Sequence, residues 1–303
     1  MVGMKVNDGW KYVVPDNIRY HEKYKGEVLI LQGYPCVNLG QCVFCTFCAD
    51  NSWDTAQMLE KKSAAINKLK GKWGHVRVFN CGSIFELPFP SLLVLKSRIE
   101  LMGIKSVITE SHWRYHLHFD ALRDFFDPSI NLIIRIGVET FDTCLRENIM
   151  RKGIGKDILA EDIRKVTDAV CLFIGFKGQT HESIKNDITL ALDHFNYIWL
   201  DVADPSYMCP ELIDFDLIFW FFEELLNTFP VPVHLDYDAF NHGNYQRPFV
   251  LMYPSVKGTM PIYNEKHCDQ ECTMCLRNPK QKTMLIRNFV GSKSIKKKFF
   301  DKV

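Results

Sequence analysis

Short apolar runs alternate with amphipathic segments along most of the chain. The runs predict strands that are buried on both faces of a sheet. They occur at 28–31, 76–79, 106–109, 132–138, 170–174, 197–202 and 232–237. Apolar positions at helical spacing predict helices between them. These helices are expected at 52–69, 92–101, 117–126, 157–166, 181–195 and 215–226, with Thr180 as an N-cap residue.

This alternation predicts an α/β fold with parallel crossovers. The architecture is a full or partial β/α barrel, or else a doubly wound sheet. In either arrangement the active site lies at the C-terminal ends of the strands. We divide the chain into an N-terminal extension (1–26), a barrel (27–240) and a C-terminal extension (241–303).

Composition and charge narrow the class of protein. A hydrophobic content of 47% can form a large core, and 37 basic against 36 acidic residues give a net charge of +1, so no overall affinity for nucleic acid or membrane is expected. No run approaches the roughly 20 apolar residues of a membrane span, and residues 1–10 lack a signal-peptide core. A cytoplasmic protein is expected. In that reducing compartment, eleven cysteines favour metal or cluster ligation over disulfides.

Four cysteines crowd into the loop that follows the first predicted strand. Cys36, Cys42, Cys45 and Cys48 are separated by five, two and two residues. Such short spacing suits a metal ion, an iron–sulfur cluster or a disulfide. Because the loop follows the C-terminal end of the strand at 28–31, we expect it to form part of the active site.

The loop and the strand ends after it resemble the radical S-adenosylmethionine superfamily. An apolar strand precedes the cysteines, and the last two enclose an aromatic residue in Cys42-Val43-Phe44-Cys45. The first spacing of five residues is longer than the usual three, as in some family members. The segments at 79–83, 136–140 and 175–178 resemble family motifs at successive strand ends. The resemblance implies a partial barrel of six β/α units with a C-terminal extension.

The resemblance also implies cofactors. Cys36, Cys42 and Cys45 would bind a 4Fe–4S cluster whose fourth iron binds S-adenosylmethionine. One electron, from a donor such as flavodoxin or ferredoxin, would split this cofactor into methionine and a 5′-deoxyadenosyl radical that abstracts hydrogen from the substrate. The implied cofactor contacts are Phe44, Asn80, Gly82, Ser83, Glu110 and Glu139. Two alternatives remain open: a triplet of Cys42, Cys45 and Cys48 with Phe47 as the aromatic residue, and a zinc ion bound by all four cysteines.

Acidic residues after the last strands are candidates for substrate binding. Asp201 and Asp204 follow the sixth predicted strand, and Asp236 and Asp238 the seventh, although loop acids are common. Glu110 and Glu139 have an alternative role as partners of Arg135 or Arg114. No catalytic residue is singled out. Cys144 and Cys171 fall within predicted elements and are expected in the core.

A second cysteine triplet lies near the C-terminus. Cys268, Cys272 and Cys275 are separated by three and two residues, and too few residues follow them to build a barrel. They predict a second metal site, either an auxiliary iron–sulfur cluster or zinc. The candidates for a fourth ligand are Cys48, His267 and Cys209. The basic segment at 277–302 is either a solvated tail or a phosphate-binding surface.

The long first spacing and the C-terminal triplet resemble the queuine lyases. That resemblance implies a lyase of queuosine salvage, which cleaves queuosine or queuosine 5′-phosphate and releases queuine. The expected partner is a small nucleoside or nucleotide; RNA is not favoured, and no membrane partner is expected. The alternative is a radical S-adenosylmethionine enzyme that modifies tRNA and holds RNA phosphates with its basic tail. A third hypothesis is a zinc-bearing interaction protein.

Overall fold

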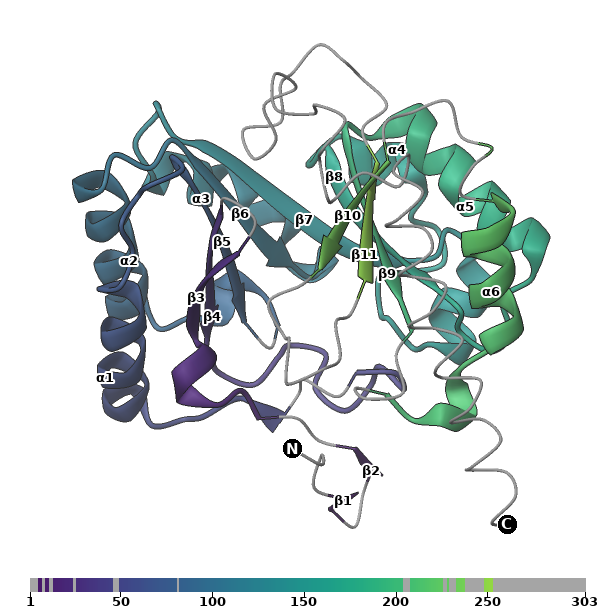
Figure 1. Cartoon of the computed structure of the whole chain (residues 1–303), viewed down its shortest axis with the longest axis horizontal. Helices are drawn as coiled ribbons and strands as arrows, with labels where there is room; N and C mark the ends of the chain where they lie inside the picture. Colours follow the sequence, from purple (N-terminus) through teal and green to yellow (C-terminus); the bar gives the residue numbers. More distant parts are fainter. Residues whose placement is uncertain are drawn as a thin grey trace.

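The centre of the molecule is a curved sheet of nine strands in the order β10-β11-β9-β8-β7-β6-β5-β4-β3 (Figure 1). The structure is a computed structural model. It describes residues 5–6, 9–10, 13–23, 26–45, 49–80, 82–203, 208–225, 228, 233–237 and 248–252.

Six neighbouring strands of the sheet run parallel. They are β4 (Gly26–Leu31), β5 (His75–Asn80), β6 (Ser106–Ser111), β7 (Asn131–Glu139), β8 (Ala169–Ile174) and β9 (Tyr197–Val202). Each strand contains one of the predicted apolar runs, because a strand covered on both faces is apolar at most positions. The predicted α/β fold, a partial barrel built on six parallel strands, is confirmed.

Antiparallel strands flank this row. β3 (Tyr20–Lys23) pairs with β4 at one edge, and β11 (Pro248–Met252) pairs with β9 at the other. β10 (Val233–Tyr237) matches the seventh predicted strand but pairs with β11, so it lies outside the parallel row. β1 (Lys5–Val6) and β2 (Gly9–Trp10) pair separately.

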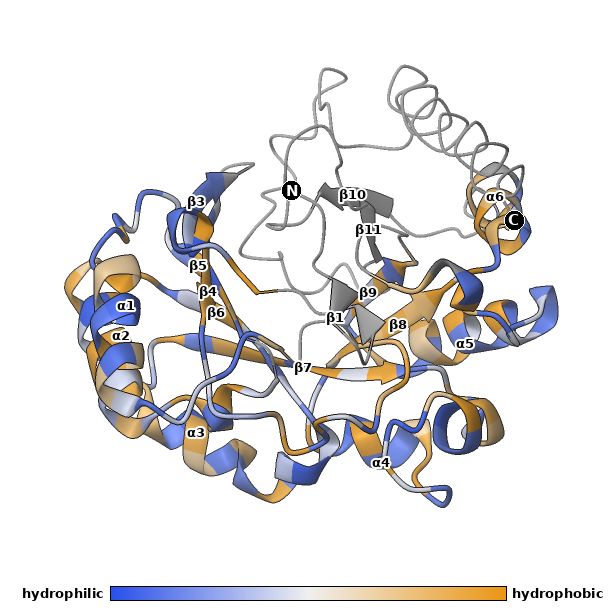
Figure 2. Ribbon diagram, turned by 90° about the horizontal axis from the view of Figure 1, so that it is seen from below, coloured by the Kyte–Doolittle hydropathy of each residue, from blue (hydrophilic) through white to orange (hydrophobic). Residues whose placement is uncertain are grey.

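Helices line the outer side of the curved sheet and turn apolar residues toward it (Figure 2). They are α1 (Thr55–Ile66), α2 (Phe89–Leu101), α3 (Phe119–Phe125), α4 (Ala160–Arg164), α5 (His181–His194) and α6 (Phe215–Glu223). Short turns of other helix types are η1 (Asp16–Ile18), η3 (Ile84–Glu86), η4 (Trp113–His118), η5 (Leu145–Ile149) and η6 (Pro210–Leu212). The predicted N-cap is confirmed, because the Thr180 side chain accepts a hydrogen bond from the Ser183 amide.

The two faces of the sheet carry different clusters. One face packs with the helices in the main core, where Leu29, Val78 and Leu200 are buried. The opposite face holds a smaller cluster that includes Ile108, Cys171 and Trp199 and contains strand residues alone. Because side chains alternate along a strand, this second cluster lies on the inner side of the curve.

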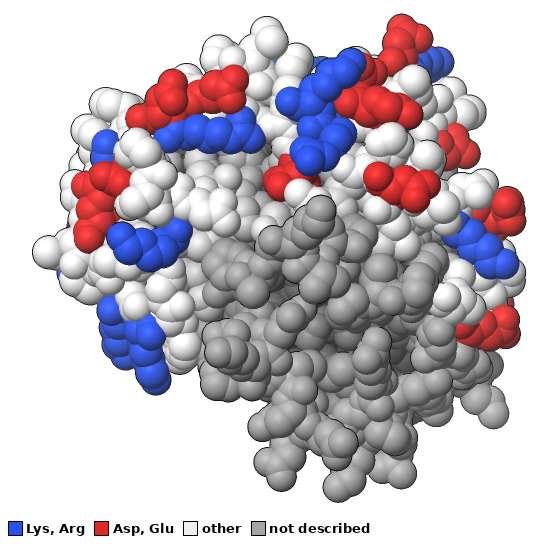
Figure 3. Space-filling model, turned by 90° about the horizontal axis from the view of Figure 1, so that it is seen from above, with Lys and Arg blue, Asp and Glu red and all other residues white. Residues whose placement is uncertain are grey.

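Acidic and basic side chains are mixed on the surface, in agreement with the net charge of +1. Seen from above, acidic and basic side chains lie next to one another over the described part of that face (Figure 3). Within the described ranges, no helix combines the length and apolar character needed to cross a bilayer.

Candidate functional site

The first three cysteines lie together in the loop after β4. The side chains of Cys36, Cys42 and Cys45 are half-buried, and none of them forms a disulfide within the described part of the chain. The Tyr34 amide donates to the Glu86 carbonyl at 2.8 Å, and the Val43 amide donates to the Met150 carbonyl at 3.2 Å. The loop is therefore held between the segments that follow β5 and β7, at the C-terminal end of the barrel.

A buried carboxylate supports the first cysteine. Glu86 accepts hydrogen bonds from the Val37 amide at 2.5 Å, from the Ser83 amide at 2.6 Å and from the Tyr115 hydroxyl at 3.2 Å. Burial raises the pKa of the Glu86 carboxyl despite these donors. Burial also raises the pKa of the Cys36 thiol to about 11, and the nearby Glu86 carboxylate adds to this shift.

Asn38 connects the second cysteine to the loop after η5. Its Nδ2 lies 2.9 Å from Cys42 Sγ, 3.2 Å from the Arg151 carbonyl and 3.0 Å from the Lys152 carbonyl. The side chain is buried. Hydrogen bonds to a ligand sulfur influence the properties of iron–sulfur clusters, so Asn38 is a supporting residue of the candidate site.

Glu139 and Lys152 form an ion pair next to this loop. Lys152 Nζ donates to Glu139 Oε1 at 2.5 Å, and the side chains are 13% and 8% exposed. The ammonium also lies 5.6 Å from the centre of the Phe44 ring. Gly137 leaves room for the pair, since a Cβ there would lie 2.9 Å from Glu139 Oε1 and 3.1 Å from Lys152 Nζ.

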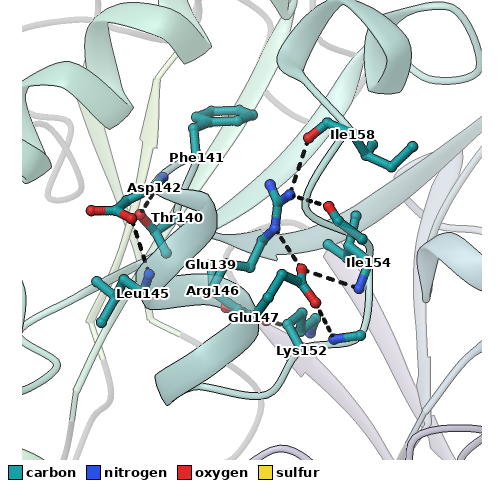
Figure 4. A network of polar contacts seen from close by, with 12 residues as sticks. Glu139, Thr140, Phe141, Asp142, Leu145, Arg146, Glu147, Lys152, Ile154 and Ile158 are labelled. Carbon is teal, nitrogen blue, oxygen red and sulfur yellow. Dashed lines mark hydrogen bonds and ion pairs between the residues drawn. The ribbon is translucent and has the colours of Figure 1, made fainter.

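A buried arginine shapes the loop that carries Lys152 (Figure 4). Arg146 donates to Glu147 Oε1 at 2.8 Å and to the carbonyls of Gly155 and Ile158 at 2.8 and 3.0 Å. Glu147 in turn accepts from the Gly153 amide at 3.0 Å. These contacts fold the segment 150–158 back toward the barrel.

His112, which directly follows β6, contacts the same loop. Its Nε2 lies 2.7 Å from the Lys152 carbonyl, and its Nδ1 accepts from the Arg114 amide at 3.1 Å. The ring is therefore neutral with its proton on Nε2. Burial, together with the nearby Lys152 charge, lowers the pKa of His112 to about 4.

Asp187 of α5 holds the turn that follows Glu139. Its Oδ1 accepts a hydrogen bond from the Phe141 amide at 2.7 Å. Burial raises the pKa of this carboxyl from 3.8 to about 7. The fold therefore favours the protonated form, and its contribution to stability is lost as the pH rises from about 4 to about 7.

Asp187→Asn is expected to remove this pH dependence. At 1.36 kcal/mol per pKa unit the wild type loses roughly 4 kcal/mol across the window, so above pH 7 the variant should have the higher free energy of unfolding. Urea unfolding between pH 4.5 and 8 measures the effect. Asp193→Asn, at an exposed position of the same helix, is the control. A variant curve parallel to that of the wild type would exclude Asp187 as the titrating group.

The predicted cofactor loop after β5 uses its polar side chains within the protein. Asn80 Nδ2 donates to the Ser83 carbonyl at 2.8 Å, and Ser83 Oγ accepts from the His112 amide at 2.7 Å. Gly82 faces Glu86, because a Cβ at this position would lie 1.8 Å from Glu86 Oε2. A side chain at 82 would occupy the space of the carboxylate that supports Cys36.

Gly82→Ala is expected to lower the free energy of unfolding by about 1–3 kcal/mol, the usual effect of overpacking. Chemical denaturation measures the loss. If the clash with Glu86 is its cause, combining Gly82→Ala with Glu86→Ala should give less than the sum of the single effects. Strict additivity would show that the two residues do not interact.

The inner face of the barrel carries an arginine between two aromatic rings. The Arg135 guanidinium lies 5.1 Å from the ring centres of both Phe79 and Trp199, and it forms an ion pair with Glu110. Glu110 is 31% exposed and so reaches the mouth of the barrel. The structure thus contains the ion pair with Arg135 that the sequence offered as the alternative role of Glu110. Glu139 pairs with Lys152, which the sequence did not suggest.

The remaining predicted residues fall into three groups. Asp201 is half-buried near the end of β9, and the Phe44 ring packs 5.5 Å from the Phe173 ring. Cys171 is buried as predicted, and burial raises its pKa to about 12, but Cys144 is exposed, so its assignment to the core was wrong. Several predicted positions lie outside the described residues, namely Phe47, Cys48, Asp204, Asp238, His267, Cys268, Cys272 and Cys275, and the side chain of Asp236 in β10 does too.

The donor set of the loop fits an iron–sulfur cluster. Each cysteine of such a cluster binds a different iron, so its thiolates need not converge on one ion. Among the described residues, no group of three His, Cys, Asp or Glu side chains could bind a single metal ion. Cys209 is a candidate for the fourth ligand of the predicted second metal site, and its Sγ lies 2.6 Å from Glu211 Oε2. Three half-buried thiols with an amide donor and an ammonium beside them match a negatively charged cluster.

Sequence patterns missed Asn38, Glu86, His112 and Lys152. Asn38 reaches carbonyls 113 and 114 residues away, and Glu86 reaches an amide 49 residues away. No spacing within the chain predicts such contacts. The one available signal was Gly137 in the predicted motif at 136–140, where the absence of a side chain makes room for Lys152.

Solved structures resemble this chain, whereas family models and curated proteins do not. No protein-family model matches the sequence, and no curated protein matches it. Among solved structures, the chain is similar to queuine lyase from Clostridium spiroforme bound to SAM and queuine, with 31% identity and a TM-score of 0.62 over 69% of this chain and 89% of that one. It also aligns with a structure of TYW1 with a lysine–pyruvate adduct bound, over 81% of this chain and 86% of that one, but 13% identity and a TM-score of 0.43 carry no functional argument.

Proposed function

This chain belongs to the queuine lyase family of radical S-adenosylmethionine enzymes, and we propose that it cleaves queuosine or queuosine 5′-phosphate to release queuine. One observation carries the proposal. The chain matches 89% of a queuine lyase that binds SAM and queuine, at 31% identity. The position of the three cysteines at the C-terminal end of six parallel strands supports it, because this is the catalytic end of β/α folds.

Cys36, Cys42 and Cys45 would hold a 4Fe–4S cluster and leave one iron open for S-adenosylmethionine. When bound, the cluster supplies the electron that cleaves this cofactor to methionine and a 5′-deoxyadenosyl radical. Asn38 would donate to the Cys42 sulfur, and Glu86 would keep the chain around Cys36 in place through the Val37 amide.

The inner barrel face would bind S-adenosylmethionine and the substrate. Arg135 holds the Glu110 carboxylate at the mouth, so that Glu110 can accept hydrogen bonds from ribose hydroxyls or from amino groups. Asp201 at the end of β9 would accept from the amino and ring N–H donors of a deazaguanine base. Asp204, Asp236 and Asp238 stay predictions for the same role.

Aromatic side chains would keep water from this space. Trp199 and Phe79 are only 2% and 5% exposed, and they enclose Arg135 on the inner face. Phe44 joins Phe173 and Phe176 at the mouth, with ring centres 5.5 and 6.3 Å away. Excluding water protects a radical from side reactions.

The substrate class is tested by product analysis. The anaerobically reconstituted chain, with a chemical reductant and S-adenosylmethionine, is incubated with queuosine, queuosine 5′-phosphate or queuosine-containing tRNA, and free queuine is quantified. We expect queuine from the nucleoside or the nucleotide and none from tRNA. Reaction with tRNA alone would favour the tRNA-modifying alternative, and queuine from no substrate would refute the lyase proposal.

A further inference from the structure

Backbone strain surrounds the Glu139–Lys152 pair. In the described part of the chain, the non-glycine residues with positive φ are Glu139 at +69° and Arg151 at +56°, the direct neighbour of Lys152. Such conformations are strained and persist where surrounding contacts demand them. The strand pairing also shifts register between Gly137 and Glu139, so the pair lies at a bulge.

Lys152 is fixed at both ends. Its carbonyl lies 3.0 Å from Asn38 Nδ2 and 2.7 Å from His112 Nε2. Its ammonium lies 2.5 Å from Glu139 Oε1, in the space that Gly137 leaves open. The charge therefore has one defined position, unlike that of a lysine in solvent.

That position is next to the cysteine loop. Burial lowers the pKa of Lys152, but the charges of Glu139, Cys42 and Cys45 outweigh it and hold the pKa above its usual value. The ammonium lies 5.6 Å from the centre of the Phe44 ring, and Phe44 lies between Cys42 and Cys45 in the loop. On the other side of the loop, Cys36 lies near the Glu86 carboxylate. The loop thus has a fixed cation beside Phe44, between Cys42 and Cys45.

A fixed positive charge favours the reduced form of a cluster, because reduction adds negative charge. We propose that Lys152 is a positioning residue that raises the reduction potential of the cluster held by Cys36, Cys42 and Cys45, and that Glu139 limits this rise. The inference rests on the proposed function, which supplies the cluster. It assigns the ion pair a role in electron acceptance that is separate from binding substrate.

Glu139→Gln and the double variant Glu139→Gln/Lys152→Met test the role. The two variants differ only at position 152, where one keeps the lysine ammonium and the other has a methionine. Neither variant leaves the Glu139 carboxylate buried without a partner. Lys156→Met, at an exposed lysine of the same loop, is the matched control. The midpoint potential is measured on the reconstituted full chain, without S-adenosylmethionine, by redox titration followed by electron paramagnetic resonance, after iron and sulfide analysis.

Glu139→Gln should have a more positive potential than the wild type, because it keeps the ammonium and loses the carboxylate. At a fixed potential, the ratio of reduced to oxidised cluster should be about tenfold lower in the double variant than in Glu139→Gln, equivalent to about 59 mV for one electron. Lys156→Met should match the wild type.

Equal potentials in the two Glu139 variants, or a more negative one in Glu139→Gln, would overturn the inference. If the double variant takes up no iron, the midpoint potential of Glu139→Gln is compared with that of the wild type alone. A more positive value supports the inference, and an equal or more negative value overturns it. A wild type without iron or sulfide would instead refute the proposed function itself.

Discussion

Cys42→Ser should abolish iron binding at the first loop and, with it, the formation of 5′-deoxyadenosine. Loss of a supporting residue at a metal site usually reduces activity by roughly 10–100-fold, and loss of a ligand should exceed this range. Cys42 lies at the centre of the loop, where its sulfur accepts a hydrogen bond from Asn38 at 2.9 Å. It also belongs to both cysteine triplets that the sequence allows. Iron content, the visible absorption of the cluster and 5′-deoxyadenosine yield measure the result.

The control is Cys144→Ser, because Cys144 is an exposed thiol in the part of the chain that follows β7. This variant should keep wild-type iron and activity. Cys36→Ser and Cys48→Ser then separate the two triplets, and the proposed ligand set requires that Cys36→Ser loses iron while Cys48→Ser keeps it at the first loop. A brown Cys42→Ser protein with normal iron content would show that the ligand assignment is wrong.

Arg19→Met should lower the free energy of unfolding by about 3–5 kcal/mol, the usual effect of breaking a buried ion pair. Arg19 donates to both carboxylate oxygens of Asp50, at 3.1 and 2.9 Å, and both side chains are buried. Arg19 also donates to the Val14 carbonyl at 2.9 Å. Asp50 follows the cysteine loop, so the pair joins the segment before β3 to the end of that loop. Removing the guanidinium takes away the side chain that donates to both oxygens of the buried Asp50 carboxylate.

Urea unfolding with two comparison variants tests this explanation. Asp16 is the second acidic partner of Arg19, and its side chain is 61% exposed. Asp16→Asn should therefore change the free energy of unfolding by less than about 1 kcal/mol. Arg19→Met/Asp50→Leu removes both buried charges and should recover much of the loss. If the double variant is no more stable than Arg19→Met, the lost packing of Arg19, and not the unpaired charge, explains the effect.

The parallel strands were predictable because each contains a run of mostly apolar residues. The run at 170–174, for example, reappears inside β8. The flanking strands were not predictable in the same way. β3 contains Tyr20, His21, Glu22 and Lys23, which form no apolar run. β11 inserts between β9 and β10, and only strand pairing reveals such an order.

The site was predictable as far as the chain itself brings residues together. Cys36, Cys42 and Cys45 are close in sequence, and the parallel strands bring Glu110 and Glu139 to the same edge. What the sequence could not show is which charges meet. Glu110 pairs with Arg135 across β6 and β7, but Glu139 pairs with Lys152, which reaches back from a loop shaped by Arg146 and Glu147.

The fate of the substrate's ribose hydrogen tests the central claim most directly. The reconstituted chain is given queuosine, or its 5′-phosphate, with deuterium at every ribose carbon, and queuine and 5′-deoxyadenosine are quantified together by mass spectrometry. Radical cleavage predicts that deuterium enters 5′-deoxyadenosine and that this labelled product rises together with free queuine. Release of queuine with no 5′-deoxyadenosine, or with 5′-deoxyadenosine free of deuterium, would contradict the account.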